Sequence, residues 1–204
     1  MTKLFLIRHG ETTWNVESKA QGAKNIELSE VGRQQAAYLA ERISKYKIDY
    51  IFSSDLDRAY ETASIIGGKI NKEVSQIGDL REMSFGKWEG LTQKQIKEVY
   101  KEHFIVWRNN PHKADIPDGE RLIDVQNRAL RAVNDVVDKH KGKNILIVSH
   151  GVTIKTIILG IMGIGLSDFY KITQNNTCIN VIEYRDYGPV ILRLNDTAHL
   201  ENIK

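Results

Sequence analysis

Two short, unbroken runs of apolar residues in this chain each stop at a histidine. The first run, residues 4–7, leads into Arg8 and His9, and the second, residues 145–148, leads through a serine into His150. Apolar runs of this length predict strands buried on both faces, as in a parallel sheet. Ligands of open α/β sheets bind beyond the carboxyl ends of the strands. We therefore expect the two histidines at the same end of one sheet.

The spacing of apolar residues between these runs predicts alternating helices and strands. A helix is expected over residues 29–45, followed by a strand over 49–52 and a helix over 56–66. The pair Gly67-Gly68 is a natural place for that helix to stop. The order strand, helix, strand, helix implies parallel pairing of the strands. The predicted fold is thus α/β, a three-layer α/β/α sandwich with a mostly parallel central sheet.

The middle of the chain is less regular. Residues 73–78 are a candidate strand, residues 92–107 have helical spacing, and residues 109–119 contain two of the three prolines. We interpret residues 80–120 as a small helical and loop lid inserted into a single domain that spans residues 1–204. Further on, the pattern predicts helices over 122–141 and 152–162 and a late strand pair, 181–184 and 190–194, around a turn at 187–189.

Composition narrows the classes of partner. Lysine and arginine total 29 against 26 acidic residues, a net charge of only +3, so bulk electrostatics do not suggest binding to nucleic acid or to a membrane surface. Cys178 is the only cysteine, which excludes an internal disulfide and fits a reducing compartment. The first strand begins almost at Met1, and no apolar run approaches membrane-spanning length. We predict a cytoplasmic protein, and a homodimer is left open.

Several common devices for binding cofactors are missing. The sequence has neither the Gly-x-x-x-x-Gly-Lys-Ser/Thr loop nor the Gly-x-Gly-x-x-Gly pattern of nucleotide sites. Its six histidines do not show the spacing of metal ligands. We therefore expect no metal and no other cofactor, and a use of histidine that does not involve a metal.

Polar residues at the predicted strand ends indicate a site for a phosphoryl group. Arg8 and His9 end the first strand, Arg58 follows the second, and His150 follows the later one. Arginine suits phosphate because its planar fork donates two hydrogen bonds at once and keeps its charge. A neutral histidine can attack phosphorus and hold it covalently. Glu82, in an apolar loop, is the candidate general acid for the leaving oxygen, because burial favours the protonated side chain.

Each of these residues also has a simpler interpretation. Arg8 could pair with a surface carboxylate, and Arg58 could pair with Asp55 or Glu61 on a helix surface. Cys178 lies in an apolar stretch and is interpreted as a small buried side chain and not as a catalytic thiol. The argument for a functional site depends on these residues occurring together. Four such residues at strand ends are improbable as independent accidents.

The motifs around these residues resemble those of the histidine phosphatase superfamily, in its phosphoglycerate mutase-like branch 1. The similarity covers nearly the whole chain, and the motifs occur in the family's order. They are Arg8-His9-Gly10-Glu11-Thr12 with Asn15, Gln21-Gly22, Leu28-Ser29-x-x-Gly32-x-Gln34-x-Ala36, Ser53-Ser54-Asp55-Leu56-x-Arg58-Ala59-x-x-Thr62-Ala63, Leu80-Arg81-Glu82-Met83-x-Phe85-Gly86-x-Trp88-Glu89-Gly90 and Ser149-His150-Gly151.

The resemblance implies a role for each matching residue. His9 would carry a transient phosphoryl group, Arg8, Arg58 and His150 would form the phosphate pocket, and Glu82 would donate a proton. Asn15 matches a position that contacts the transferring group, and Gln21, Gly22 and Gly151 would complete the phosphate-binding set. No metal is implied.

Departures from the mutase pattern favour a phosphatase. Phe85 replaces a tyrosine, Gln93 replaces a lysine, Asn109 replaces one of two paired arginines, and Val152 replaces an asparagine. Each change removes a polar contact suited to a phosphoglycerate. The pattern is closest to the short phosphatase members, so we predict a metal-independent phosphomonoester hydrolase of small phosphorylated metabolites. A cofactor-dependent phosphoglycerate mutase, or a catalytically silent binding protein of the same fold, is the alternative.

Overall fold

The first strand lies in the interior of a six-stranded sheet with the order β3-β2-β4-β1-β5-β6. The computed structural model describes residues 1–201. Strands β1 to β4 run parallel, whereas β5 is antiparallel to β1 and β6 is antiparallel to β5. The strands are β1 (Thr2–Arg8), β2 (Tyr50–Ser53), β3 (Val74–Gln76), β4 (Asn144–Ser149), β5 (Ile179–Arg185) and β6 (Gly188–Asp196).

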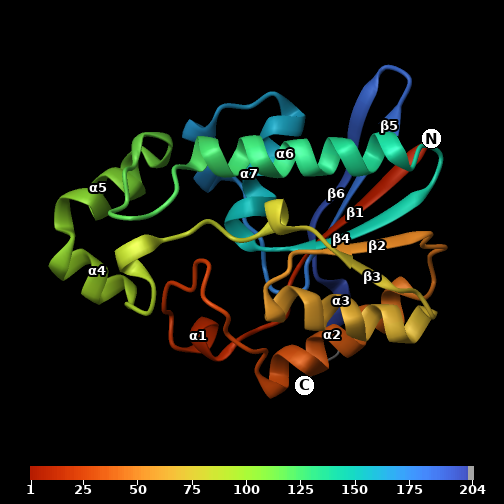
Figure 1. Cartoon of the computed structure of the whole chain (residues 1–204), viewed down its shortest axis with the longest axis horizontal. Coiled ribbons are helices and arrows are strands. Elements are labelled where there is room, and N and C mark those ends of the chain that lie inside the picture. The colour runs from red at the N-terminus through yellow and green to blue at the C-terminus, as the bar shows by residue number, and fades with distance from the viewer. Residues whose placement is uncertain (202–204) are drawn as a thin grey trace.

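Helices cover both faces of this sheet (Figure 1). Helices α2 and α3 lie on one face, and α6 and α7 lie on the other. The predicted three-layer sandwich is therefore confirmed. The α-helices are α1 (Thr13–Val16), α2 (Glu30–Ile43), α3 (Asp57–Ile70), α4 (Gln93–Val99), α5 (Lys101–Asn109), α6 (Leu122–Lys139) and α7 (Gly151–Met162).

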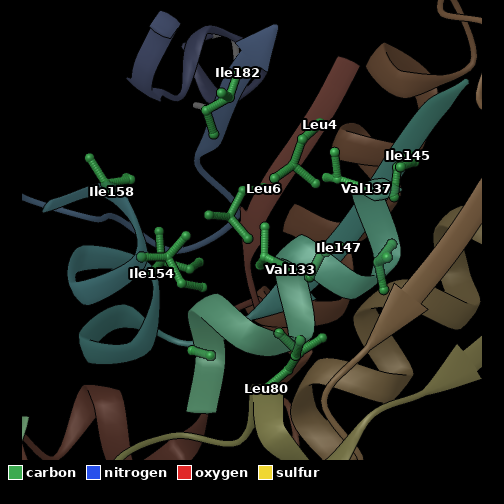
Figure 2. Close-up of a cluster of buried hydrophobic side chains, with 14 residues drawn as sticks. Leu4, Leu6, Leu80, Val133, Val137, Ile145, Ile147, Ile154, Ile158 and Ile182 are labelled. Carbon is green, nitrogen blue, oxygen red and sulfur yellow. The ribbon is translucent and has the colours of Figure 1, made fainter. Parts of the chain in front are cut away.

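The alternation of side chains along β1 divides the core into two layers. Leu4 and Leu6 point toward α6 and α7, where they join Ile147 of β4 in the cluster that Figure 2 shows. Phe5 and Ile7 point to the opposite face and pack against α2 and α3. A strand with both faces buried in this way is apolar without interruption, which explains the sequence pattern.

Two of the predicted helix boundaries are wrong. Helix α3 continues through Gly67 and Gly68 and ends at Ile70, and its C-cap is Asn71, whose φ of 54° lies in the left-handed region. Gly67 instead allows the chain to pass close to the helix, since a Cβ there would come within 2.6 Å of the Lys72 carbonyl oxygen. The single helix predicted over 92–107 is two helices, because Tyr100 leaves the helical region with φ −121° and ψ 43°.

Two strand predictions also need correction. β3 covers only Val74–Gln76 and is shorter than the predicted strand over 73–78. The late hairpin turns at Asp186 and Tyr187, because Gly188 and Pro189 already pair with β5 as the first residues of β6. Proline is tolerated there because β6 is an edge strand, on which one row of backbone donors has no partner strand.

Residues 80–120 extend beyond one end of the sheet, where α4 and α5 project to the side (Figure 1). Their apolar residues, including Trp88, Ile96 and Ile116, form a third cluster with Leu159 of α7 and with Phe169. This segment therefore shares a core with the helix that follows His150. Its movement as a lid stays a prediction. Within residues 1–201, no helix is both long and apolar enough to cross a membrane.

Truncating a side chain in the central layer should be costly. Ile147 of β4 is 0% exposed, so Ile147→Ala should lower the free energy of unfolding by about 2–5 kcal/mol through lost burial and a residual cavity. The matched control is Ile123→Ala in α6, where the side chain is 40% exposed and the change should stay within about 0.5 kcal/mol. Urea denaturation measures both, and equal losses would contradict this account of the core.

Candidate active site

The register between β1 and β4 brings the two histidines together. Arg8 is paired with Ser149 across the parallel ladder, so His9 and His150 leave their strands side by side. Their rings lie 5.1 Å apart between centroids, and both side chains are buried. The chain leaves β1 and β4 in opposite directions along the sheet, toward β2 and β5 respectively. The pair therefore stands at a topological switch point, where α/β sheets bind ligands.

The hydrogen bonds of His9 define which of its nitrogens can react. Its Nδ1 lies 2.6 Å from the Gly10 carbonyl oxygen, an acceptor, so Nδ1 carries the proton in this arrangement. Nε2 is then left with a free lone pair. The His9 carbonyl accepts a hydrogen bond from the side chain of Asn176 at 3.1 Å, which helps to fix the backbone. The structure thus presents a neutral, oriented imidazole.

Two arginines, one buried and one half-buried, lie beside the histidine pair. Arg58, which is 0% exposed, donates from its two terminal nitrogens to the carbonyl oxygens of Gly22 and Lys24, at 2.8 and 2.7 Å. Arg8 donates from Nη1 to the Gln174 carbonyl at 2.7 Å. Within the described residues, the Nε of each arginine is buried and has no hydrogen-bond partner. Unused donors of this kind require a ligand or water, because buried polar groups are normally satisfied.

The simpler interpretations of these arginines are wrong. Asp55 pairs with Arg81, and Glu61 pairs with Arg33, so neither carboxylate is the partner of Arg58. Among residues 1–201, no acidic side chain lies within salt-bridge distance of the Arg8 guanidinium either. Both arginines bond to backbone carbonyls, which orient the guanidinium groups without neutralising them.

The buried charge acts on the protonation of its neighbours. Burial, followed by the charges of Arg58 and Arg8, holds the pKa of His9 well below its usual value. Burial and the nearby Arg58 lower the pKa of His150 in the same way. Burial also lowers the pKa of Arg58 to about 10, which still leaves it a cation at neutral pH. The site consequently combines two cationic arginines with two neutral imidazoles.

The loop that carries Gly22 closes one side of the site. Gly22 has φ +55°, and a Cβ there would come within 2.1 Å of the Glu89 carboxylate. That carboxylate accepts hydrogen bonds from the backbone of Ala23, at 2.9 Å, and of Phe85, at 3.1 Å. Glu89 therefore joins the loop around Gly22 to residues 84–90, and only glycine fits between them.

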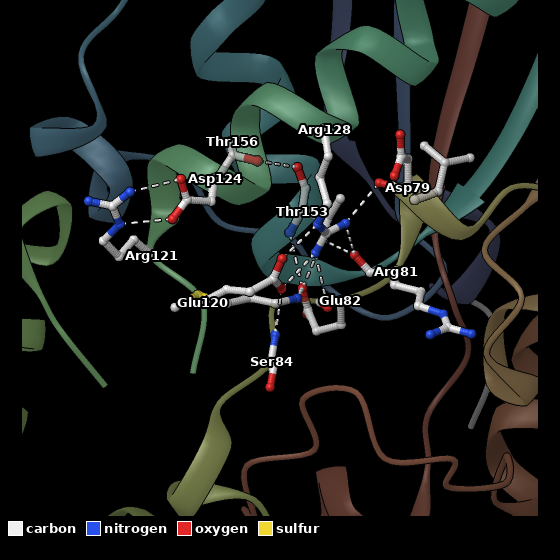
Figure 3. Close-up of polar contacts among 12 residues, drawn as sticks. Asp79, Arg81, Glu82, Ser84, Glu120, Arg121, Asp124, Arg128, Thr153 and Thr156 are labelled. Atoms are coloured by element: carbon white, nitrogen blue, oxygen red, sulfur yellow. Dashed lines mark hydrogen bonds and ion pairs between the residues drawn. The ribbon is translucent and has the colours of Figure 1, made fainter. Parts of the chain in front are cut away.

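Glu82 lies against the N-terminus of α7, as Figure 3 shows. Its carboxylate accepts hydrogen bonds from the backbone N–H groups of Val152, Thr153 and Met83, at 3.0 to 3.1 Å. The Thr153 hydroxyl lies 2.8 Å from the Arg81 carbonyl oxygen and 3.1 Å from the Glu82 carboxylate, and its single proton can go to only one of them. These contacts fix the position of the carboxylate at the edge of the cavity. The role of Glu82 as a proton donor stays a prediction.

The first α-helix is a single turn that orients Asn15. The Asn15 side-chain oxygen accepts from the backbone and hydroxyl of Thr12 at 3.1 Å, and its backbone N–H bonds back to the Thr12 hydroxyl at 3.2 Å. Asn176 donates to the same side-chain oxygen at 3.3 Å. With its oxygen occupied, the amide nitrogen of Asn15 is the group left for the cavity.

A cavity of about 150 Å³ occupies the space between these groups. Of the residues that the sequence indicated, Arg8, His9, Asn15, Gln21, Gly22, Arg58 and Glu82 line it. His150 and Gly151 are not part of its lining, but His150 stands beside His9, and both its ring nitrogens are buried without a partner among the described residues. Gly151 lies against Arg8, since a Cβ there would be 3.5 Å from its Nε.

Several residues around the cavity were not identified from the sequence. Lys19 and Ala20 line it, and together with Phe85, which the sequence did indicate, they also line an adjoining cavity of about 350 Å³ rich in aromatic side chains. Gln174 and Asn176 contact Arg8 and His9 from a loop before β5. No local pattern marks these two residues, because the Gln174 carbonyl and the Asn176 side chain become part of the site only through the pairing of β5 with β1.

The remaining candidates for chemistry stay outside the cavity. Burial raises the pKa of the Cys178 thiol to about 11, which removes its reactivity and fits the interpretation as a small buried side chain. Across residues 1–201, no group of three or more histidine, cysteine or acidic side chains is placed to hold a metal ion.

Comparison with known proteins connects this geometry to a family. Residues 4–197 match the family model described as histidine phosphatase superfamily (branch 1). Phosphoserine phosphatase 1 of Hydrogenobacter thermophilus is 36% identical over 200 residues, which cover 98% of this chain and 95% of the relative.

Solved structures agree with this match. Bacillus stearothermophilus YhfR superposes with a TM-score of 0.94 and 37% identity, over 98% of this chain and 100% of that chain. A mutant phosphoserine phosphatase of Entamoeba histolytica in complex with phosphoserine gives a TM-score of 0.86 and 36% identity, with the same coverage of both chains.

Stability should decrease in mild acid because the buried histidines are neutral. Unfolded histidine titrates near 6.5, and the pKa values of His9 and His150 are lower in the folded chain. Below about pH 6.5 the unfolded chain therefore binds more protons. Each of the two should cost about 1 kcal/mol of unfolding free energy by pH 5.5.

Urea denaturation from pH 7.5 to 5.0 in phosphate-free buffer measures this slope. His150→Asn should flatten the slope, whereas the control His103→Asn, at an exposed position of α5, should leave it unchanged. A slope that does not respond to His150→Asn would mean that this ring is charged in the folded protein.

Proposed function

We propose that this chain, which belongs to the histidine phosphatase superfamily (branch 1), hydrolyses phosphomonoesters by passing the phosphoryl group through His9 to water. Its membership of this family and its similarity to phosphoserine phosphatases support its assignment as a phosphatase of small phosphorylated metabolites. The roles of individual residues are our proposal. The observation that carries it is the Nε2 of a neutral His9 in a cavity with two cationic arginines.

In the first step, His9 Nε2 attacks phosphorus and the bond from phosphorus to the ester oxygen breaks. Arg8 and Arg58 stabilise the charge on the phosphoryl oxygens, using the Nε donors that have no partner in the described chain. His150 adds a further donor from its ring. Glu82 transfers its proton to the leaving oxygen, so that the products are an alcohol and a phosphohistidine.

In the second step, water attacks the phosphohistidine. The ionised Glu82 takes a proton from the water as its oxygen bonds to phosphorus, and the bond from phosphorus to His9 Nε2 breaks. Inorganic phosphate leaves, and His9 is again neutral. Each group thus returns to its starting state, and the reaction needs no metal.

The surroundings of the cavity support water, and not a second phosphoglycerate, as the acceptor. Phe85 lines both cavities with a ring that has no hydroxyl. Arg108 faces the Tyr170 ring, with its guanidinium 5.1 Å from the ring centroid, and Lys19 pairs with Glu17. A mutase must hold a highly charged ligand in place during transfer, and few unengaged polar groups remain here to do so.

We propose phosphoserine and similarly small monoesters as the first substrates to test. The supporting observation is that the relative from Hydrogenobacter thermophilus is named as a phosphoserine phosphatase. We also place the protein in the cytoplasm, since its one cysteine is a buried free thiol. The exposed edge strand β6 is where a second copy could add to the sheet.

Replacing the proposed nucleophile should abolish turnover. His9→Ala removes the atom that accepts the phosphoryl group, so release of inorganic phosphate from phosphoserine or 4-nitrophenyl phosphate should fall by about 10³-fold or more. Rapid quenching of the wild-type protein with ³²P-labelled substrate should trap an acid-labile phosphoryl group that His9→Ala lacks. Binding of inorganic phosphate should persist in the variant because both arginines remain.

Three outcomes would contradict this mechanism. Acid-stable label would place the phosphoryl group on a residue other than histidine, and full activity of His9→Ala would exclude the nucleophile. Interconversion of 3- and 2-phosphoglycerate with a bisphosphoglycerate primer, at high turnover and without release of phosphate, would favour the mutase.

The proton donor can be tested with two leaving groups of nearly the same size. Glu82→Gln keeps the shape but cannot donate as an acid, so kcat/KM for phenyl phosphate should fall by about 10²-fold or more. For 4-nitrophenyl phosphate, whose leaving group needs no proton, kcat/KM should fall far less. This parameter covers steps up to the first irreversible one, so it isolates the first transfer. Equal losses for both esters would exclude Glu82 as the donor.

A further inference from the structure

The segment that carries Glu82 has little secondary structure of its own. After a short 3-10 turn at Gly78–Leu80, residues 81–85 form neither helix nor strand. The backbone there must still satisfy its carbonyl groups, because they lie at the edge of a buried site. Side chains from α6, the start of α7 and the loop before α6 provide most of those contacts.

One side chain provides most of the anchoring. Arg128 of α6 donates from Nη1 to the carbonyl oxygens of Asp79 and Arg81, both at 2.8 Å, and from Nη2 to that of Glu82 at 3.2 Å. Its Nε and Nη2 also donate to the Glu120 carboxylate, at 2.9 and 3.0 Å. An arginine has five N–H donors, and all five of these are used. Figure 3 shows the guanidinium between Glu120 and the segment.

Glu120 extends this contact to the other side of Glu82. Its carboxylate accepts from the Ser84 backbone N–H at 2.9 Å, and its own N–H donates to the Ser84 carbonyl at 2.9 Å. Arg128 and Glu120 together therefore fix the backbone on both sides of the proposed acid. The Arg128 side chain is only 15% exposed, so water does not replace these bonds readily.

The fixed backbone determines where the Glu82 carboxylate lies. The Glu82 side chain crosses from the segment to the start of α7, where it meets the N–H groups of Val152 and Thr153. A general acid must reach the leaving oxygen at hydrogen-bond distance, and a displacement of about 1 Å is enough to reduce transfer strongly. Arg128 itself is not part of the lining of the cavity.

We infer that Arg128, held by Glu120, is a positioning residue for proton donation by Glu82. This inference rests on the proposed role of Glu82 and adds a separate requirement, which is the shape of the guanidinium and not its charge. A lysine at position 128 would keep the charge but offer three donors from one atom, too few to span three carbonyls and a carboxylate.

The test uses the ratio of kcat/KM for 4-nitrophenyl phosphate to that for phenyl phosphate. Arg128→Lys should lower the value for phenyl phosphate by about 10-fold or more and change that for 4-nitrophenyl phosphate little, so the ratio rises as in Glu82→Gln. The matched control is Arg131→Lys, one turn along α6, whose 65% exposed side chain contacts only the Asp79 carboxylate of this segment. It should leave both values unchanged.

The outcomes separate the inference from the mechanism on which it rests. A higher ratio in Glu82→Gln and Arg128→Lys, but not in Arg131→Lys, supports both. If Glu82→Gln raises the ratio while Arg128→Lys lowers both esters equally or not at all, Arg128 is only structural and the inference is wrong. If Glu82→Gln leaves the ratio unchanged, the proton donor and the inference both fail. Should Arg128→Lys fail to fold, Glu120→Gln replaces it and must raise the ratio in the same direction.

Discussion

The arrangement of this molecule depends on keeping two arginines charged inside the protein. Arg58 in the first turn of α3 is buried, Arg8 at the end of β1 is half-buried, and neither has a carboxylate as a direct partner among residues 1–201. Burying a charge without a counterion is unfavourable, so the fold surrounds these guanidiniums with carbonyl oxygens from other loops. Burial, followed by the charge of these arginines, holds the pKa values of His9 and His150 well below their usual value. On the proposed mechanism, one constraint therefore produces both the anion site and a nucleophile in the reactive state.

The pattern of apolar residues predicted the frame that satisfies this constraint, because each strand that matters is buried on both faces. Residues 4–7 and 145–148 pair in register, so their following histidines had to meet. The predicted helix boundaries were wrong where a tertiary contact determined the backbone conformation. Gly67 is tolerated within α3 because its missing side chain lets the chain return closely at Lys72, and Tyr100 breaks the helix over 92–107 where the chain packs around Trp88. Such contacts leave no periodic signal in the sequence.

Residues of the candidate site that directly follow a buried strand could be predicted from the sequence. Residues that reach the site from distant segments of the chain could not. Arg8, His9 and His150 stand beside apolar runs that place them. Gln174 and Arg128 lie in segments whose local pattern is that of an ordinary loop and an ordinary amphipathic helix. Gln174 offers a backbone carbonyl to Arg8, and Arg128 offers its guanidinium to the segment around Glu82. Both contacts form only when β5 and α6 pack against the rest of the fold. The candidate reacting groups could therefore be predicted from the sequence, whereas the residues that orient them could not.

On the proposed mechanism, the two arginines also link binding of the substrate to its reaction. A phosphoryl dianion that enters the cavity meets two cationic guanidinium groups, whose Nε donors have no partner among residues 1–201. Binding there brings phosphorus to the neutral imidazole of His9. As the bond to the leaving oxygen breaks, the same donors stabilise the charge on the phosphoryl oxygens. One set of groups would therefore both bind the ester and lower the barrier to its transfer, which accounts for keeping charge where burial disfavours it.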